Sequence, residues 1–205
     1  MMSVDFLLTS LVVVLIPGTG VLFTVSTGLA RGRRASVFAA LGCTAGILPH
    51  LLAAVLGLAA VLHMSAVAFQ GLKLAGAAYL LYLAWATWRD TGALAVDAAT
   101  AAPASARGLL VRAFLLNILN PKLSIFFLAF LPQFVVPGAL SPLAQMLALS
   151  GVFMAMTFVV FVAYGVLANA FRHAVVESPR VQSWLRRGFA AAFAGLGANL
   201  ALAER

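Results

Sequence analysis

Long apolar runs, separated by short polar or turn-rich connections, make up most of this chain. Six such segments cover residues 6–30, 36–62, 66–88, 109–135, 142–170 and 185–202. At about 1.5 Å of rise per residue, helices of this length suit a hydrocarbon core of roughly 30 Å. The pattern predicts an all-α membrane protein with six transmembrane helices in a single domain, residues 1–205.

The composition supports a membrane protein and disfavours nucleic acid as a partner. Hydrophobic residues make up 64% of the chain and charged residues 9%, whereas soluble domains carry roughly 25% charged residues. The net charge of +8 reflects a shortage of acids, of which there are five, so it indicates membrane topology rather than nucleic-acid binding. The first basic residue is Arg31, so we expect no cleaved signal peptide and a first span that is retained.

The basic residues alternate between connections. They cluster after the first, third and fifth segments, whereas the connections at 63–65 and 136–142 contain no Lys or Arg. The positive-inside rule then places the basic connections in the cytoplasm and both termini in the periplasm of a bacterial inner membrane.

The chain divides into two similar halves. Repeat 1 covers about 1–90, a linker rich in Ala and Thr about 91–107, and repeat 2 about 108–205. Pro17 and Pro121 each stand about a dozen residues into an apolar segment. Three segments per half is an odd number, so the halves must insert in opposite orientations, as inverted repeats of secondary transporters do. The alternative is chance similarity between helices rich in Ala and Leu.

The prolines predict breaks in the first and fourth helices. Pro17 removes an amide donor, and Gly18 and Gly20 loosen the backbone beside it. Asn120 suits an N-cap, and Pro121 suits the first position of a restarted helix. Bare backbone at membrane depth is tolerated only inside protein or beside a watery cavity. We therefore expect broken helices next to a transport site, with plain proline kinks and no ligand as the alternative.

Two helix N-termini that meet from opposite sides attract an anion, and the helix C-termini before the breaks offer carbonyls to an ammonium group. A zwitterionic amino acid meets both demands. The candidate substrate-binding residues are Pro17, Gly18, Thr19, Gly20, Asn117, Asn120, Pro121 and Lys122.

Lys122 and His50 are the candidates for proton transfer. Lys122 is a charge within a span, which is costly and typical of function; it would pair with a substrate carboxylate or titrate, or else snorkel from a shallow turn. His50 follows Pro49 in the second segment, and imidazole gains and loses a proton near neutral pH. No Asp or Glu lies deep in a segment, so a proton-coupled mechanism would use His50 or Lys122. A hydrogen-bonded structural role is the alternative for His50.

The sequence favours neither an enzyme nor a resident metal or cofactor. The segments contain no HExxH motif and no paired carboxylates. Cys43 lies two helical turns before His50 on the expected helix, but these two residues cannot complete a coordination sphere. Transport of a metal or another small ion remains the alternative to amino-acid transport.

Two further sets of residues have simpler interpretations. Gly42 and Gly46, and Gly195 with Gly197, are typical of helix-packing surfaces. The aromatic residues at the end of the third segment predict a belt at the membrane interface; they are Tyr79, Tyr82, Trp85 and Trp88. Tyr79 lies deepest, and the alternative is that it faces the cavity.

The ordered motifs of the chain resemble the LysE/RhtB family of amino-acid exporters over its whole length. The likeness lies in Ile16-Pro17-Gly18, Gly42 with Gly46, the run 76–83, Asn117 with Asn120-Pro121-Lys122, and Gly195-Leu196-Gly197. The resemblance implies a small inner-membrane exporter of amino acids or their derivatives, driven by the proton gradient and assembled into homo-oligomers.

One departure bears on the substrate. Family members commonly read Pro-Gly-Pro in the first span, often followed by Asn, whereas this chain has Thr19 and Gly20 after Pro17-Gly18. Thr19 adds a hydroxyl, and we expect Gly20 to leave room where other residues would place a side chain. The lack of deep carboxylates disfavours a cationic substrate side chain and favours neutral amino acids such as homoserine, threonine or leucine.

Overall fold

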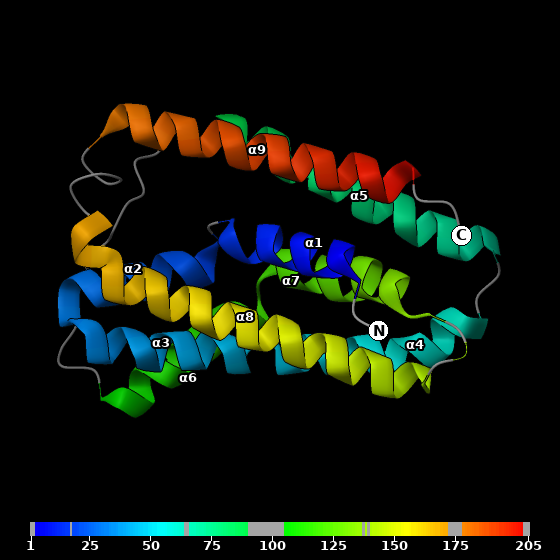
Figure 1. Ribbon diagram of the computed structural model, residues 1–205, viewed down its shortest axis with the longest axis horizontal. Helices are drawn as coiled ribbons and strands as arrows, with labels where there is room; N and C mark the ends of the chain where they lie inside the picture. Colours follow the sequence, from blue (N-terminus) through cyan, green and yellow to red (C-terminus); the bar gives the residue numbers. More distant parts are fainter. Residues whose placement is uncertain are drawn as a thin grey trace.

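The computed structural model describes residues 3–16, 18–63, 66–89, 105–136, 138, 140–171 and 178–202. Every regular element within these ranges is a helix, and the long helices α5, α8 and α9 run nearly along one long axis (Figure 1). The predicted all-α class is confirmed. Pro17 and the linker residues 90–104 lie outside the described residues.

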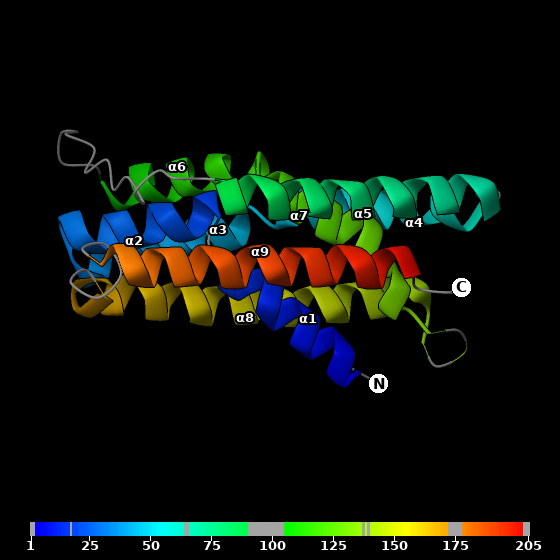
Figure 2. The same ribbon diagram turned by 90° about the horizontal axis from the view of Figure 1, so that it is seen from above.

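The first and fourth segments are broken where the prolines predict. Helices α1 (Val4–Leu15) and α2 (Thr19–Arg31) are bent by 54°. Helix α6 (Ala106–Ile118) and the chain from Lys122 to Phe134 are bent by 57°, the second part comprising α7 (Pro121–Ile125), η1 (Phe126–Phe130) and η2 (Leu131–Phe134). Figure 2 shows α1 leaving the direction of α2.

The second segment differs from the expectation of one continuous helix. Helix α3 (Arg33–Ala45) ends in a turn at Gly46 and Ile47, after which α4 (Leu48–His63) begins. Pro49 explains the turn, because it has no N–H to donate to the carbonyl four residues earlier. His50 therefore lies in the first turn of α4, and Cys43 belongs to a different helix, so the two do not share a helix face.

The remaining segments form three long helices. These are α5 (Ala66–Arg89), α8 (Pro142–Phe171) and α9 (Pro179–Leu202), the last of which begins six residues earlier than expected. Helix α5 packs chiefly against α9, and the pair forms a layer of its own in Figure 1. Helices α2, α3, α6 and α8 pack against one another in the other layer.

Helix lengths agree with membrane insertion. Within the described residues, Arg33–Gly57 and Pro142–Ala168 are long and apolar enough to cross a bilayer, and each bent pair qualifies when its two halves are taken together. Four of the expected segments thus meet the length and composition test.

Glycines allow the closest helix contacts. A Cβ on Gly42 would overlap the carbonyl of Leu110 in α6, and one on Gly28 would overlap the carbonyl of Gly165 in α8. Gly46 also lies against α6, so the predicted packing role of Gly42 and Gly46 is confirmed. The same expectation does not hold at Gly195 among the described residues, none of which has an atom within 4 Å of a Cβ placed there. Gly197 is buried.

Candidate functional site

The carbonyl end of α1 is the first part of the site. In a continuous helix the amide of residue 17 would donate to the carbonyl of Val13, but Pro17 has no N–H. The backbone then leaves the helix at Ile16, whose φ and ψ are −63° and 120°. The carbonyls of Val13 and Ile16 therefore need donors from elsewhere, because buried backbone acceptors are costly to leave unpaired.

Lys122 supplies those donors. Its Nζ donates to the carbonyl of Val13 at 2.9 Å and to that of Ile16 at 2.8 Å. The side chain is 9% exposed, so the alternative in which it snorkels from a shallow turn is wrong. The C-terminal end of a helix carries partial negative charge, which favours an ammonium group there. Tyr164 of α8 completes this end by donating its hydroxyl to the Leu15 carbonyl at 3.0 Å.

The second break is capped by its own residues. The Oδ1 of Asn120 accepts from the backbone N–H of Lys122 at 3.1 Å, and α7 begins at Pro121. This confirms the predicted N-cap and helix restart. The Nδ2 of Asn120 donates to Oδ1 of Asn117 at 3.2 Å, so the cap is itself held by the last turn of α6.

Asn117 links the second break to α3. Its Nδ2 donates to the carbonyl of Cys43 at 2.6 Å. That carbonyl is open because the turn at Gly46 directs the amide of Ile47 to Thr44 instead. Asn117 is 1% exposed, and its side chain joins the α3–α4 turn to the α6–α7 break.

His50 binds the backbone at the second break. Pro121 has no N–H for the carbonyl of Asn117, and Nε2 of His50 lies 3.1 Å from that oxygen. A carbonyl only accepts, so Nε2 carries the hydrogen. The other ring nitrogen, Nδ1, lies 3.2 Å from Oγ of Ser124. The hydrogen-bonded role expected as the alternative for His50 is confirmed, and its role in proton transfer stays a prediction.

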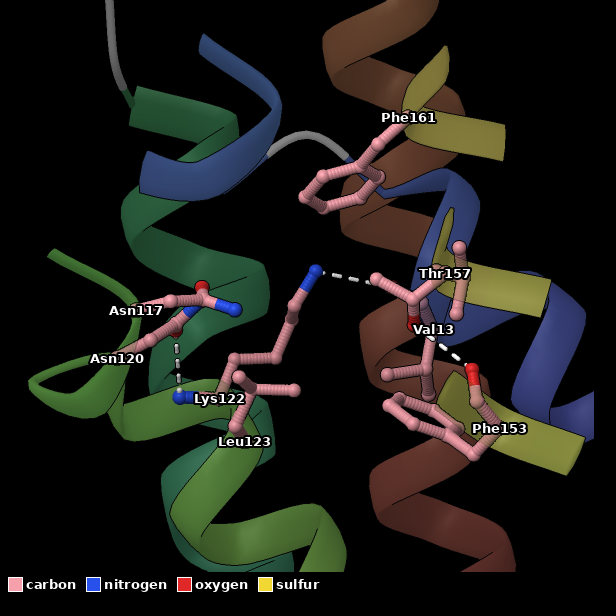
Figure 3. Close-up of a pocket in the computed structure, with 9 residues that line it drawn as sticks. Val13, Asn117, Asn120, Lys122, Leu123, Phe153, Thr157 and Phe161 are labelled. Atoms are coloured by element: carbon pink, nitrogen blue, oxygen red, sulfur yellow. Dashed lines mark hydrogen bonds between the residues drawn. The ribbon is translucent and has the colours of Figure 1, made fainter. Parts of the chain in front are cut away.

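A small cavity lies between the two breaks, and Figure 3 shows Lys122 reaching across it toward α1. Its lining comprises Val13, Val14, Asn117, Asn120, Lys122, Leu123, Phe153, Thr157 and Phe161. Three of the candidate residues, Asn117, Asn120 and Lys122, thus meet at one place. None of the lining side chains is acidic.

The contribution of α8 to the site does not follow from the sequence pattern. Phe153, Thr157 and Phe161 form one wall of the cavity, and Tyr164 caps α1. Phe and Thr in a uniformly apolar segment give no local signal of a site. Tyr164 does stand out, since it is one of three tyrosines in the chain and lies within that otherwise apolar segment.

The start of α2 lies beside Lys122, but not every residue there faces the cavity. A Cβ on Gly18 would lie 3.5 Å from Nζ of Lys122 and 3.7 Å from Nδ2 of Asn120. Thr19 is exposed and does not line the cavity. The expected room at Gly20 is absent, because a Cβ there would meet Phe161 at 2.9 Å and Asn117 at 3.0 Å.

Cys43 and His50 contact different groups and do not form a pair. The Cys43 thiol is buried against the carbonyls of Gly20 and Ala113 and the hydroxyl of Thr24. Among the described residues, no group of three or more His, Cys, Asp or Glu side chains could hold a metal ion.

Helices broken by prolines around a buried cation, in an otherwise apolar helical chain, define an integral membrane transporter. The family model for LysE type translocators matches residues 11–204. The chain belongs to that family, as its motifs indicated, and it is a transporter rather than an enzyme.

Named relatives cover most of the chain. The homoserine/homoserine lactone efflux protein of Salmonella typhimurium is 36% identical over 200 residues, which is 97% of this chain and 95% of that protein. An uncharacterised membrane protein of Vibrio cholerae is 34% identical over 97% of this chain and 96% of its own. The leucine efflux protein of Klebsiella pneumoniae is 32% identical over 67% and 65%, respectively. No solved structure matches the chain significantly.

Proposed function

We propose that this transporter exports neutral amino acids across the bacterial inner membrane, with the cavity between the two helix breaks as the binding site. The observation that carries the proposal is the buried ammonium of Lys122 on the carbonyls of Val13 and Ile16, beside the capped start of α7. An amino acid brings an ammonium and a carboxylate, the two groups that broken helix ends attract.

The chemistry of the cavity supports a neutral side chain. Its walls include Val14, Leu123 and the rings of Phe153 and Phe161, with the Thr157 hydroxyl bonded to its own helix at 2.8 Å. A cationic side chain would need a carboxylate partner at this depth, and the lining provides none. The names of the relatives, homoserine and leucine efflux proteins, fit this substrate class.

The helix contacts support six spans in two inverted repeats. The broken helix of each half packs on the second span of the other, as α2 on α8 and α6 on α3. The third spans pair with each other, as α5 with α9, and at 24 residues each they reach about 36 Å. In Figure 1 the α1–α2 pair and the α6–α7 pair run in opposite directions along the long axis. Alternating access would then rock the halves about the cavity, with both termini periplasmic as the charge pattern predicts.

Proton coupling completes the proposal, through His50 or Lys122. Asn117 joins the two, since its carbonyl contacts His50 and its side chain holds the Asn120 cap that binds the amide of Lys122. A reversed pH gradient across vesicles should reverse the direction of transport, and His50→Gln should abolish this response if His50 carries the proton.

The decisive experiment loads cells with dipeptides and measures which amino acids reach the medium. Expression of the chain should raise the efflux of homoserine, threonine or leucine, and should leave the efflux of lysine unchanged. Lys122→Ala should remove the gain while the protein remains in the membrane. Neutral amino acids exported equally with and without the chain would refute the proposal, and export of a metal ion instead would favour the alternative function.

A further inference from the structure

The carbonyl end of α1 is a built binding site for a primary ammonium group, because it already holds one. The carbonyl of Val13 has lost its amide partner to Pro17, and the carbonyl of Ile16 lies beyond the last helical turn. Both accept from Nζ of Lys122, a residue that reaches them from the other half of the chain. The carbonyl of Leu15, at the same end, accepts from the hydroxyl of Tyr164.

The same end of α1 faces the start of α2 across a very short connection. Gly18 is the N-cap of α2 and provides no side-chain hydrogen bond to the first turn. Gly18 also lies next to the ammonium group, since a Cβ built on Gly18 would be in van der Waals contact with Nζ of Lys122, at 3.5 Å. An α-amino acid carries its ammonium and carboxylate on one carbon. Bound by its ammonium at α1, it would place its carboxylate beside the amides of α2 and the displaced Lys122.

We propose that the carbonyls of Val13 and Ile16 form the subsite for the α-ammonium group of the substrate, and that Lys122 occupies this subsite as an internal substitute until a substrate displaces it. This inference rests on the proposed function. It gives Lys122 a second role besides pairing with a carboxylate: its ammonium keeps the broken end of α1 satisfied between transport cycles. An arriving amino acid exchanges one ammonium for another, so the buried carbonyls are paired before and after the exchange.

The subsite can be tested with methylammonium, which has the primary ammonium group that the subsite would bind but no carboxylate. Lys122→Ala leaves both carbonyls empty and makes room, so methylammonium should raise the unfolding midpoint of this variant in nanodiscs in a saturable manner. Tetramethylammonium, with the same charge and no N–H, should not. Lys122→Met, which fills the space without a donor, and the wild type, in which Lys122 holds the subsite, should not respond to either ion.

Equal responses of the wild type and Lys122→Ala, or no response of either, would overturn the inference. If Lys122→Ala is not recovered as folded protein, the same test applies during expression: methylammonium in the medium should restore its recovery, and failure to do so counts against the subsite. In folded Lys122→Ala, methylammonium should also raise the apparent Kd for L-homoserine in proportion to its concentration. Binding of L-homoserine that ignores methylammonium would place the amino group elsewhere.

The outcome separates this inference from the proposed function. Stabilisation of Lys122→Ala by methylammonium, with no amino-acid efflux by the wild type, would keep the subsite and remove the exporter. Efflux by the wild type, with no effect of methylammonium on the variant, would keep the exporter and remove the subsite. N-acetyl-homoserine, which lacks the ammonium, should fail to stabilise the wild type under conditions in which L-homoserine does.

Discussion

The break between α1 and α2 and the break between α6 and α7 both start from a proline that deprives a carbonyl four residues earlier of its amide. They are satisfied differently, although the Asn117 carbonyl freed at the second break is itself paired by His50 from the other half. At the second break the residues nearby provide the cap, with Asn120 on the amide of Lys122 and Asn117 on Asn120. At the first break Gly18 provides no side-chain cap, and the carbonyls are paired by Lys122 and Tyr164 from the other half.

This difference indicates that the two breaks have different roles, one structural and one in transport. The second break is anchored on α3 by Asn117 and on α4 by His50, so it can keep its shape when contacts across the cavity change. The first break is held by Lys122 across the cavity and by Tyr164 of α8, and it can move when these contacts exchange. We therefore expect substitutions at the second break to reduce stability most, and substitutions at the first break to affect transport at smaller cost in stability.

The largest loss of stability is expected where α6, which carries the second break, presses on α3. In Gly42→Ala the new methyl group would overlap the Leu110 carbonyl and lie 2.7 Å from Cβ of Ala113. Backbone cannot move aside as a flexible side chain does, so we expect a cost of about 3 kcal/mol or more and little folded protein. Thermal unfolding in detergent measures it. Gly151→Ala, with open space around the position, is the control and should be neutral.

Asn117→Leu should be the next most costly change, because it removes the anchor of the second break. The carbonyl of Cys43 and Nδ2 of Asn120 would both lose their buried partner, at a cost of about 2–3 kcal/mol. Ser124→Ala, which removes only the contact with Nδ1 of His50, should cost roughly 1 kcal/mol or less. Equal unfolding midpoints for the two variants would contradict the anchoring role of Asn117.

Substitutions at two neighbouring glycines should distinguish effects on stability from effects on transport. In Gly20→Ala the methyl group would crowd Asn117 and Phe161, so the variant should lose about 1–2 kcal/mol of stability. In Gly18→Ala the methyl group would lie at ordinary contact distance from Lys122, so stability should hold while the half-saturating substrate concentration for efflux rises several-fold. Unfolding midpoints and efflux at graded internal substrate concentrations measure both. A Gly18→Ala variant with unchanged efflux would remove the start of α2 from the binding site.

Much of the backbone follows from local signals, and the sequence predicts it well. Segment length, the breaks at Pro17 and Pro121 and the cap by Asn120 depend on chemistry within a few residues. The turn at Gly46 is not predicted, although Pro49 causes it, because the long apolar run around it has the pattern of one continuous helix.

The partners of the site depend on packing between distant segments, which no local pattern encodes. The sequence predicts Lys122 as a buried charge, but its contact with the Val13 carbonyl, 109 residues away, comes from the way the two halves pack. Gly20 looked open, whereas the space beside it is filled by Phe161 from α8. The aromatic wall of α8 lies in a segment without a polar face, so the apolar pattern gave it no orientation.

The variant with the smallest expected effect, Tyr164→Phe, tests whether the first break depends on the other half at more than one point. Tyr164→Phe removes the donor to the Leu15 carbonyl and keeps the ring, so it should lower the free energy of unfolding by roughly 1 kcal/mol. Ser26→Ala is the matched loss of one hydroxyl and should cost less, because that hydroxyl donates to the Phe23 carbonyl of its own helix. Because Lys122 would then hold the end of α1 alone, Tyr164→Phe should also speed hydrogen exchange in α1 relative to α6. Exchange accelerated equally in both helices would mean that the two breaks share one support, and the contrast between them would be lost.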